Sequence, residues 1–385
     1  MYSRRLEPTT QSFFLLGPRG TGKSTWLRAT YPGAHVIDLL SEERYQRYLA
    51  RPGAFADELR ALETGRTVVV DEVQRLPALL NEVQRFIEER QLRFVLCGSS
   101  ARKLKQAGVN LLAGRALRRA MHPFLPEELA ADFDLETALR WGTLPIVWQS
   151  PERDETLAAY AQLYLKEEIQ AEALVRNLPG FARFLPIAAL CHGQTVNVSN
   201  IAREAGVART TVGGYLEILE ETLLCFRVPG FEGRLRVRER RLPKWYWCDP
   251  GLVRAMRGAR GEPSSEERGA LFEGFVAQML RAYRDYAGLC DGIAYWCPER
   301  SGNEVDFVLT RGDEHLAIEV KSGAQFSDRW CAGLRALAPL PNLRRRMVVY
   351  PEGPRLRTED GIDVLPLGEL AAELAAGGPW ECAKG

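Results

Sequence analysis

The sequence predicts an α/β protein with more than one domain. An apolar run, Phe13–Leu16, leads directly into a glycine-rich turn, and a second run, Val68–Val70, ends in two acidic residues. Such uninterrupted runs are typical of strands buried in a parallel sheet. Residues 304–321 instead alternate apolar and polar side chains, which predicts strands with two different faces. We therefore expect an α/β domain at each end of the chain.

The chain is long enough to divide into separately packed parts. It has 385 residues, of which 46% are hydrophobic. Single cores rarely grow beyond about 250 residues, so two or three cores are expected. A proline and several charged residues near Pro151 mark one boundary, and we expect domains at residues 1–150, 151–245 and 246–385.

Composition excludes several classes of protein. The net charge of +1 gives no general affinity for polyanions, so any nucleic-acid surface must be local. The eight cysteines include no CxxC pair and no histidine-rich spacing near them, which argues against a zinc site, and their odd spacings give no disulfide framework. No apolar stretch approaches the roughly 18 residues of a membrane helix, and the N-terminal apolar run is too short for a signal peptide. We expect a cytoplasmic protein with no membrane partner.

The first glycine-rich turn matches a phosphate-binding motif. Its residues fit the pattern GxxxxGK[ST], with an apolar run before it and a helical pattern after it. In such loops the backbone N–H groups surround a phosphate, the lysine reaches the β- and γ-phosphates, and the hydroxyl binds Mg²⁺. The sequence therefore predicts an ATP site formed by Gly17, Pro18, Arg19, Gly20, Thr21, Gly22, Lys23, Ser24 and Thr25.

Two carboxylates follow the second buried strand. Asp71 and Glu72 come directly after Val70, at the strand end where open α/β sheets bind ligands. We expect Asp71 to hold Mg²⁺ through water, together with Ser24, and Glu72 to polarise the attacking water. The alternative is an acidic start to the next helix.

The order of these motifs resembles the AAA+ ATPase superfamily. A third apolar strand ends in Ser99 and Ser100, and an arginine follows in the sequence LLAGR. The resemblance implies that one of these serines senses the γ-phosphate, and that Arg115 is an arginine finger acting on a neighbouring subunit in a homo-oligomer. Arg118 and Arg119 compete for that role, and a solvent-facing arginine is the alternative.

The middle of the chain has the pattern of a helix-turn-helix. Residues 198–205 and 209–223 show helical apolar spacing on either side of Gly206. Residues 227–244 follow with six Arg and one Lys against two Glu, as expected for the basic wing of a winged helix that contacts DNA. The residues that begin the second helix are Arg209, Thr210 and Thr211. A helical packing module with a solvated arginine-rich loop is the alternative.

The alternating strands near the C-terminus predict a hairpin. Placing Gly312 and Asp313 at the turn pairs Leu309 with Leu316 and Phe307 with Ile318 on an apolar face. On the opposite face the same register sets Asp306 against Glu319, and Glu304 against Lys321. Opposed like charges destabilise a sheet unless a cation lies between them.

A divalent cation would explain the opposed carboxylates. Asp306 and Glu319 would share Mg²⁺ or Mn²⁺, and Lys321 would act on the attacking water or the phosphate. Glu273, between two phenylalanines on a predicted helix, is available as a third ligand. This set resembles the PD-(D/E)xK nuclease-like superfamily, although Val305 stands where many members have proline. An inactive module of the same fold and an ordinary hairpin are the alternatives.

Nearly the whole chain resembles one family, the uncharacterised prokaryotic AAA-type ATPases that carry a C-terminal domain of unknown function. The resemblance rests on the order of the motifs above, together with DEVQRLP, LPKWYWCDPGLVRAMRG and LFEGFVAQML. The resemblance implies ATP binding. From the motifs taken together we expect ATP hydrolysis coupled to DNA binding and metal-dependent DNA cleavage. Two alternatives stay open: a nucleotide-switched regulator with an inert nuclease-like fold, and a protein-remodelling or signalling ATPase without a nucleic-acid partner.

Overall fold

The computed structural model describes residues 2–99, 112, 114–164, 177–232, 239–299 and 302–380. The chain forms two compact units. The N-terminal unit comprises Arg4–His122 and Glu217–Leu224. The C-terminal unit comprises Met1–Ser3, Pro123–Leu216 and Cys225–Gly385. The predicted division into three domains stays a prediction.

The N-terminal unit contains the expected parallel sheet. Its five strands run in the order β2-β3-β4-β1-β5, and every neighbouring pair is parallel. The two apolar runs are β1 and β3, which are separated by β4. Consequently the carboxyl ends of β1 and β3 lie at the same edge of the sheet. The strands are β1 (Phe13–Leu16), β2 (His35–Asp38), β3 (Thr67–Asp71), β4 (Arg93–Gly98) and β5 (Leu117–Ala120).

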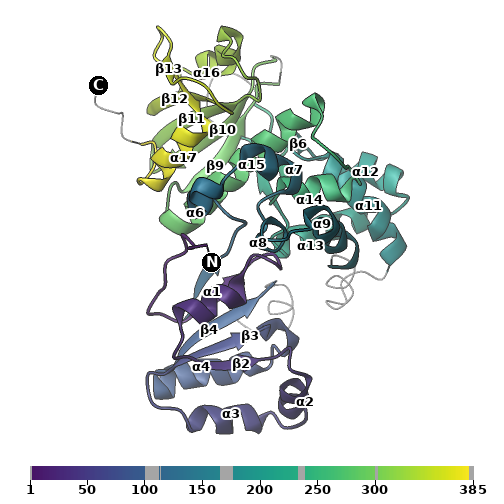
Figure 1. Ribbon diagram of the computed structural model, residues 1–385, viewed down its shortest axis with the longest axis vertical. Coiled ribbons are helices and arrows are strands. Elements are labelled where there is room, and N and C mark those ends of the chain that lie inside the picture. The colour runs from purple at the N-terminus through teal and green to yellow at the C-terminus, as the bar shows by residue number, and fades with distance from the viewer. Residues whose placement is uncertain are drawn as a thin grey trace. The chain divides into compact units, whose positions relative to one another are not determined.

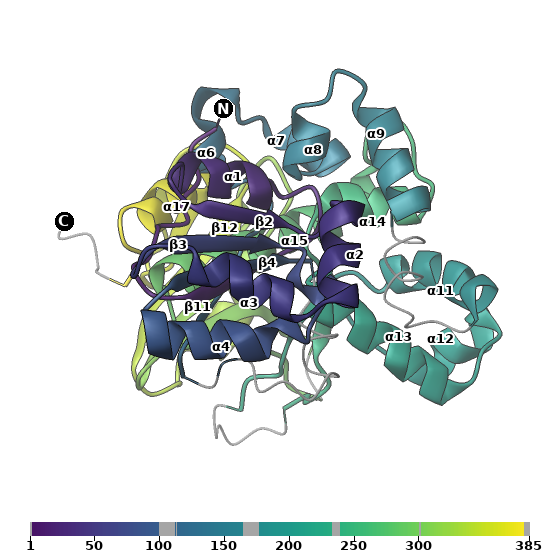
Figure 2. The ribbon, with the colours of Figure 1, turned by 90° about the horizontal axis from the view of Figure 1, so that it is seen from below.

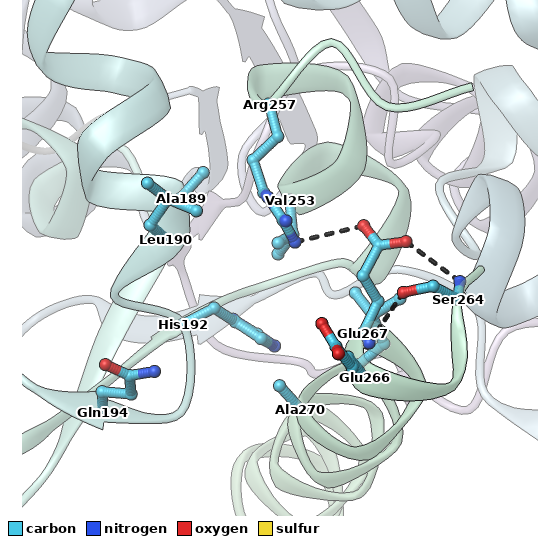
Figure 3. Close-up of a pocket in the computed structure, with 11 residues that line it drawn as sticks. Ala189, Leu190, His192, Gln194, Val253, Arg257, Ser264, Glu266, Glu267 and Ala270 are labelled. Atoms are coloured by element: carbon cyan, nitrogen blue, oxygen red, sulfur yellow. Dashed lines mark hydrogen bonds and ion pairs between the residues drawn. The ribbon is translucent and has the colours of Figure 1, made fainter.

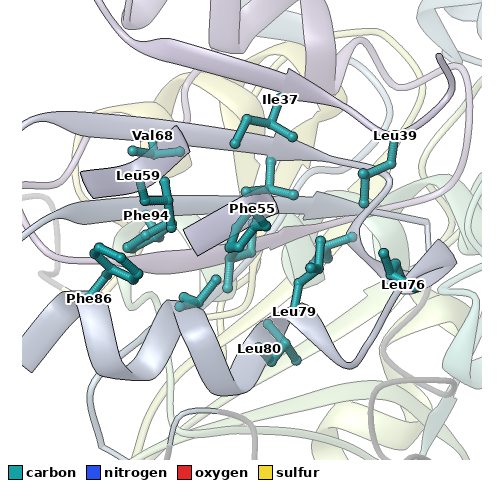
Figure 4. Packing of buried hydrophobic residues seen from close by; sticks show 14 of the residues in the cluster. Ile37, Leu39, Phe55, Leu59, Val68, Leu76, Leu79, Leu80, Phe86 and Phe94 are labelled. Carbon is teal, nitrogen blue, oxygen red and sulfur yellow. The ribbon is translucent and has the colours of Figure 1, made fainter. Parts of the chain in front are cut away.

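Helices cover both faces of this sheet. Figure 2 shows α1 (Lys23–Thr30) on one face and α3 (Gly53–Arg60) with α4 (Leu79–Arg90) on the other. Phenylalanines and leucines of α3 and α4 pack on the strands in a core that excludes water (Figure 4). Burying this apolar area is the main source of the unit's stability. The unit also contains the helix α2 (Glu42–Ala50) and the short 3₁₀ helix η1 (Val73–Arg75).

Short helices open the larger part of the C-terminal unit. They are α6 (Pro126–Leu129), η2 (Ala130–Asp132), α7 (Leu135–Trp141), α8 (Pro145–Trp148), α9 (Arg153–Ala159) and η3 (Tyr160–Tyr164). The later helix α14 (Pro250–Met256) packs against α7 and α9. Asp249 joins them, because its carboxylate accepts from Thr143 N at 2.6 Å and caps α14 by accepting from Leu252 N at 3.2 Å.

Three helices and three strands follow in the order α11-β6-α12-α13-β7-β8. Two helices flank Gly206, as the apolar spacing predicts, and Gly206 adopts the left-handed conformation at φ 64° that ends α12. The strands form an antiparallel sheet with β8 in the centre. The bounds are α11 (Leu178–Leu190), β6 (Gln194–Thr195), α12 (Val198–Ala205), α13 (Arg209–Glu221), β7 (Cys225–Val228) and β8 (Lys244–Trp247).

A six-stranded mixed sheet ends the chain, in the order β13-β14-β12-β11-β10-β9 (Figure 1). The predicted hairpin is β10 and β11, and its register is confirmed, since Leu309 pairs with Leu316 and Phe307 with Ile318. The strands are β9 (Gly292–Trp296), β10 (Val305–Arg311), β11 (Glu314–Val320), β12 (Leu343–Tyr350), β13 (Leu356–Arg357) and β14 (Asp363–Pro366). The helices are α15 (Ser265–Ala287), η4 (Asp328–Cys331), α16 (Ala332–Ala336) and α17 (Leu367–Ala375).

The long helix α15 places an acidic side chain beside this sheet. A capping box starts it, in which Ser264 and Glu267 each accept from the other's backbone N–H. Its middle contacts both β8 and β11. No helix within the described ranges has the length and apolar character to span a bilayer.

Candidate functional site

The phosphate-binding loop has the predicted strand-turn-helix context. Gly22 starts α1 in the left-handed conformation, at φ 85°, which a glycine adopts without steric strain. Lys23 is buried, and its Nζ donates to the carbonyls of Gly17 at 2.7 Å and Pro18 at 3.0 Å. Thr21 is also buried and donates to the carbonyl of Pro18 at 2.7 Å. The lysine ammonium is thus held within the loop.

Packing explains the first glycine of the loop. A Cβ added at Gly17 would lie 2.4 Å from the carbonyl oxygen of Met121, just beyond β5. Any side chain at residue 17 would push the loop away from the sheet. Arg19 and Thr25, by contrast, are exposed, and Gly20 adopts φ 74°.

The hydroxyl of the motif and the first acidic residue are in direct contact. Ser24 Oγ donates to Asp71 Oδ2 at 2.7 Å. They meet because α1 begins, and β3 ends, at the same edge of the sheet. Both line a cavity of about 350 Å³ whose other walls are Leu27, Arg28, Val36, Asp38 and Val69. A hydroxyl and a carboxylate are hard oxygen donors, so this pair fits Mg²⁺.

Glu72 is held in an unusual backbone conformation. It adopts φ 57° and ψ 41°, which is the left-handed region, and its N–H donates to Asp71 Oδ1 at 3.1 Å. Non-glycine residues in this region are strained by about 1–2 kcal/mol, and such strain concentrates at functional sites. The conformation directs the side chains of the two acids differently although they are adjacent in sequence.

Gln74 links the predicted catalytic and sensing residues, and sequence reasoning missed it. Its Nε2 donates to Glu72 Oε2 at 2.5 Å and to Ser99 Oγ at 3.2 Å. Ser99 is buried at the end of β4. Space for the amide comes from Gly98, where a Cβ would lie 2.3 Å from Gln74 Oε1. The signal available in the sequence was a glutamine two residues after the second acid.

The structure does not test the roles predicted for Ser100 and Arg115. Ser100 lies outside the described residues. Arg115 forms an ion pair with Glu88 of α4, with Nε 2.7 Å from Oε1, and both side chains are about half exposed. The finger role of Arg115, and the sensor role of either serine, stay predictions.

In the C-terminal unit, four acidic side chains from three elements gather around the end of the hairpin. We call Glu273, Glu304, Asp306 and Glu319 the carboxylate cluster. Glu273 comes from α15, Glu304 immediately precedes β10, Asp306 lies in β10, and Glu319 lies in β11. Asp306 is held by an N–H of the neighbouring strand, since Val320 N donates to its Oδ2 at 2.8 Å.

A cation does lie among these carboxylates, but it is a lysine that the sequence reasoning did not consider. Nζ of Lys244 is 3.0 Å from Glu273 Oε1 and 3.4 Å from Asp306 Oδ1, and it also contacts the carboxylate of Glu304. Its side chain is only 6% exposed. Lys321, which follows β11, forms an ion pair with Glu319. The placement of Glu304 opposite Lys321 in the hairpin stays a prediction. Lys244 lies at the start of β8, 62 residues before Asp306.

As arranged, the cluster does not fit a metal ion. Among the described residues, no group of three or more His, Cys, Asp or Glu side chains could hold one. The ammonium of Lys244 takes the position between Glu273 and Asp306 that a shared cation would need. The predicted set of Glu273, Asp306 and Glu319 is thus not preformed as a metal site. Binding of Mg²⁺ or Mn²⁺ by these three residues, and cleavage of DNA, stay untested predictions.

The charges in the cluster do not balance. Four carboxyl groups face two ammonium groups, which leaves two negative charges if every group is ionised. Burial, reinforced by the charge of Asp306, raises the pKa of both Glu273 and Glu319 above the ordinary range. Burial alone would lower the pKa of Lys244, but Glu273, Asp306 and Glu304 outweigh it and raise the pKa. Lys244 is therefore charged at neutral pH.

A separate cavity of about 450 Å³ lies beside α15, and Figure 3 shows His192 at its wall with Arg257 and Glu267 opposite. Burial lowers the pKa of His192 to about 3, so the ring is neutral. Its Nδ1 accepts from Trp247 N at 3.1 Å. A Cβ added at Gly274 of α15 would lie 1.9 Å from Nε2 of His192. The histidine is therefore a packing residue that requires glycine on the helix.

Comparisons with known proteins divide the chain into three matched segments. Residues 9–130 match the AAA domain family, residues 132–262 the domain of unknown function DUF8612, and residues 268–370 the domain of unknown function DUF4143. Uncharacterized proteins of Mycobacterium tuberculosis and Mycobacterium bovis are each 25% identical to this chain, over 92% of its length and 80% of theirs.

Similarity to solved structures is low. The Aeropyrum pernix ORC1 protein in complex with DNA has a TM-score of 0.24 and 16% identity, and the match covers 71% of this chain and 89% of that chain. A signal transduction ATPase with numerous domains from Pyrococcus horikoshii has a TM-score of 0.24 and 14% identity, over 72% of this chain and 45% of that one. The match to the AAA domain family covers residues 9–130, and the phosphate-binding loop and the Ser24–Asp71 contact lie within these residues.

Proposed function

We propose that the chain hydrolyses ATP in its N-terminal unit and that this reaction controls DNA binding by residues 177–244. The observation that carries the first half is the 2.7 Å contact between Ser24 and Asp71. This contact joins the two motifs that an ATPase needs at one edge of a parallel sheet. It stands beside a cavity that both residues line.

Each residue of the nucleotide site then has a role. Lys23 exchanges its two carbonyl partners for the β- and γ-phosphates, and the backbone N–H groups of the loop bind the same phosphates. Ser24 and Asp71 would hold Mg²⁺, which neutralises phosphate charge when bound. Glu72 orients and polarises the attacking water. Gln74 donates to both Glu72 and Ser99 and so fixes the Glu72 carboxylate relative to Ser99.

The proposed DNA-binding part is a winged helix. Its support is the element order α11-β6-α12-α13-β7-β8, in which the three strands form one antiparallel sheet. Arg209 and Thr210 are exposed at the start of α13, where contacts to bases or phosphates are made. The basic segment lies between β7 and β8, and Arg240 and Arg241 within it are exposed. Arg234, Arg236 and Arg238 lie outside the described residues.

Cleavage of DNA has less support than binding. The buried contact of Lys244 with Glu273 and Asp306 favours a regulator whose nuclease-like domain carries no metal. We therefore favour nucleotide-switched DNA binding over ATP-dependent cleavage. A remodelling ATPase without a nucleic-acid partner is the outcome if no DNA or RNA binds at low salt.

Reversing two arginines of the wing should weaken DNA binding and flatten its salt dependence. In the variant Arg240→Glu with Arg241→Glu, each lost phosphate contact should reduce the slope of log affinity against log salt by about 0.9. Fluorescence anisotropy with labelled duplex at several salt concentrations measures this slope. The matched control reverses Arg51 and Arg60, which are exposed in the N-terminal unit. An unchanged slope in the wing variant would remove the wing from the binding surface.

Two glycines within α13 offer a second test. A Cβ added at Gly213 or Gly214 would meet no atom within 4 Å, so packing within the protein does not require glycine there. Alanine is better than glycine inside a helix by about 0.8–1.0 kcal/mol. We expect Gly213→Ala to raise the free energy of unfolding while weakening DNA binding, because glycine permits close approach of a phosphate backbone. Urea denaturation and anisotropy report the two effects, and an alanine variant that binds DNA as tightly as the parent would contradict the second.

A further inference from the structure

We propose that Lys244 is a built-in substitute for a divalent cation at the carboxylate cluster, and that it excludes such a cation from the unmodified protein. The ammonium contacts Glu273, Glu304 and Asp306, which come from two separate elements of the fold. A single positive group that joins three carboxylates does what a metal ion would do there. Lys244 thereby ties β8 to α15 and to β10 without any metal.

The position of Lys244 is enforced by the strand that carries it. Lys244 lies on the central strand β8 and pairs with Thr195 of β6 on one side and with Val228 of β7 on the other. Its backbone is therefore fixed at both edges. The ammonium also lies 5.4 Å from the ring centroid of Tyr295, which is within the range of a cation–π contact. Withdrawal of the lysine would need a change of side-chain rotamer within a buried site.

A tyrosine on the same strand as Lys244 also contacts the carboxylate cluster. Tyr246, two residues after Lys244 on the same strand, donates its hydroxyl to Glu273 Oε1 at 2.5 Å. That oxygen therefore receives both the hydroxyl and the ammonium. Together they satisfy the oxygen that a metal would bind.

One carboxylate oxygen is left over. Among the described residues, Glu319 Oε2 is buried and has no hydrogen-bond partner. The Glu319 side chain is 8% exposed, and its other oxygen pairs with Lys321. A buried acceptor without a partner is unfavourable, and a divalent cation would satisfy it. With the ammonium of Lys244 removed, the cluster would offer oxygen ligands alone, which suits Mn²⁺ or Mg²⁺.

The experiment measures Mn²⁺ binding by the full chain without nucleotide or DNA. All proteins carry Lys23→Ala, so that any Mn²⁺ bound by Ser24 and Asp71 is the same in every variant. Adding Lys244→Met should tighten Mn²⁺ binding at least about tenfold in calorimetry and in the electron paramagnetic resonance signal of free Mn²⁺, because a positive charge at contact distance is removed. Lys244→Arg keeps the charge and should show no gain. Adding Asp306→Asn to Lys244→Met should abolish the gain.

Several outcomes would overturn the proposal. If the Lys23→Ala parent bound Mn²⁺ as tightly as the Lys244→Met variant, the lysine would not exclude the ion. If folded Lys244→Met and Lys244→Gln variants gained no binding, the cluster would be an ion pair and nothing more. Failure of both variants to fold even with Mn²⁺ present would also count against it, because an uncovered site would be stabilised by the ion. None of these results depends on ATPase activity or on DNA binding, so failure here is separate from failure of the proposed function.

Discussion

Glu72→Gln should leave ATP binding intact and slow ATP hydrolysis by about 10²- to 10⁴-fold, the usual effect of losing a positioned base. The substitution preserves the size of the side chain and an oxygen that can accept from Gln74, so the strained turn at residue 72 should persist. Only the charge that polarises water is lost. The chemical step should therefore fail while the loop and Lys23 still bind phosphates.

The measurement pairs a phosphate-release assay with binding of a fluorescent ATP analogue. Lys23→Ala is the contrasting variant, because removing the buried ammonium should abolish nucleotide binding itself. Arg115→Ala in purified protein tests the finger role separately from the roles of Glu72 and Lys23, since it should slow hydrolysis only if subunits associate. Wild-type hydrolysis by Glu72→Gln would exclude Glu72 as the residue that polarises water.

Lys244→Met should lower the free energy of unfolding by about 3–5 kcal/mol in buffer with a metal chelator. Removing one partner of a buried ion pair leaves the opposite charge uncompensated, which is strongly destabilising. Here the lysine side chain is 6% exposed and faces three carboxylates. Methionine has nearly the same length, so the loss should reflect charge rather than an empty volume.

Chemical denaturation measures the effect, and two variants interpret it. Adding Asp306→Asn to Lys244→Met should recover part of the stability, because one of the uncompensated charges is then gone. Lys321→Met is the matched control, since that lysine is 34% exposed and, within the described part of the chain, forms an ion pair only with Glu319. Its loss should be smaller than that of Lys244→Met, because Lys321 is itself about one-third exposed and keeps part of its hydration. Equal losses for the two lysines would show that the position of Lys244 among the carboxylates has no special importance.

Short-range patterns determined much of this protein from sequence alone. The phosphate-binding loop is a run of eight residues, Gly17–Ser24, whose spacing follows from backbone geometry around a phosphate. The hairpin register follows from two-residue periodicity on either side of Gly312, and the pairing of Phe307 with Ile318 confirms it. Both patterns are local, because the residues that define them are close in the chain. The parallel N-terminal sheet was predictable for the same reason, since strands buried on both faces have uninterrupted apolar runs.

The tertiary structure alone decided which groups complete the sites. Gln74 reaches Ser99 because β3 and β4 are neighbours in the sheet, a contact over 25 residues that no periodicity encodes. Lys244 reaches Asp306 because β8 packs near α15 and the start of β10, 62 residues farther along the chain. Sequence reasoning recognised that the carboxylates needed a cation and inferred a metal, since an alternating strand reveals its own neighbours but not those contributed by another element. Close packing brings such distant side chains together. It therefore determines whether the cation among a cluster of acids is a lysine or a metal ion.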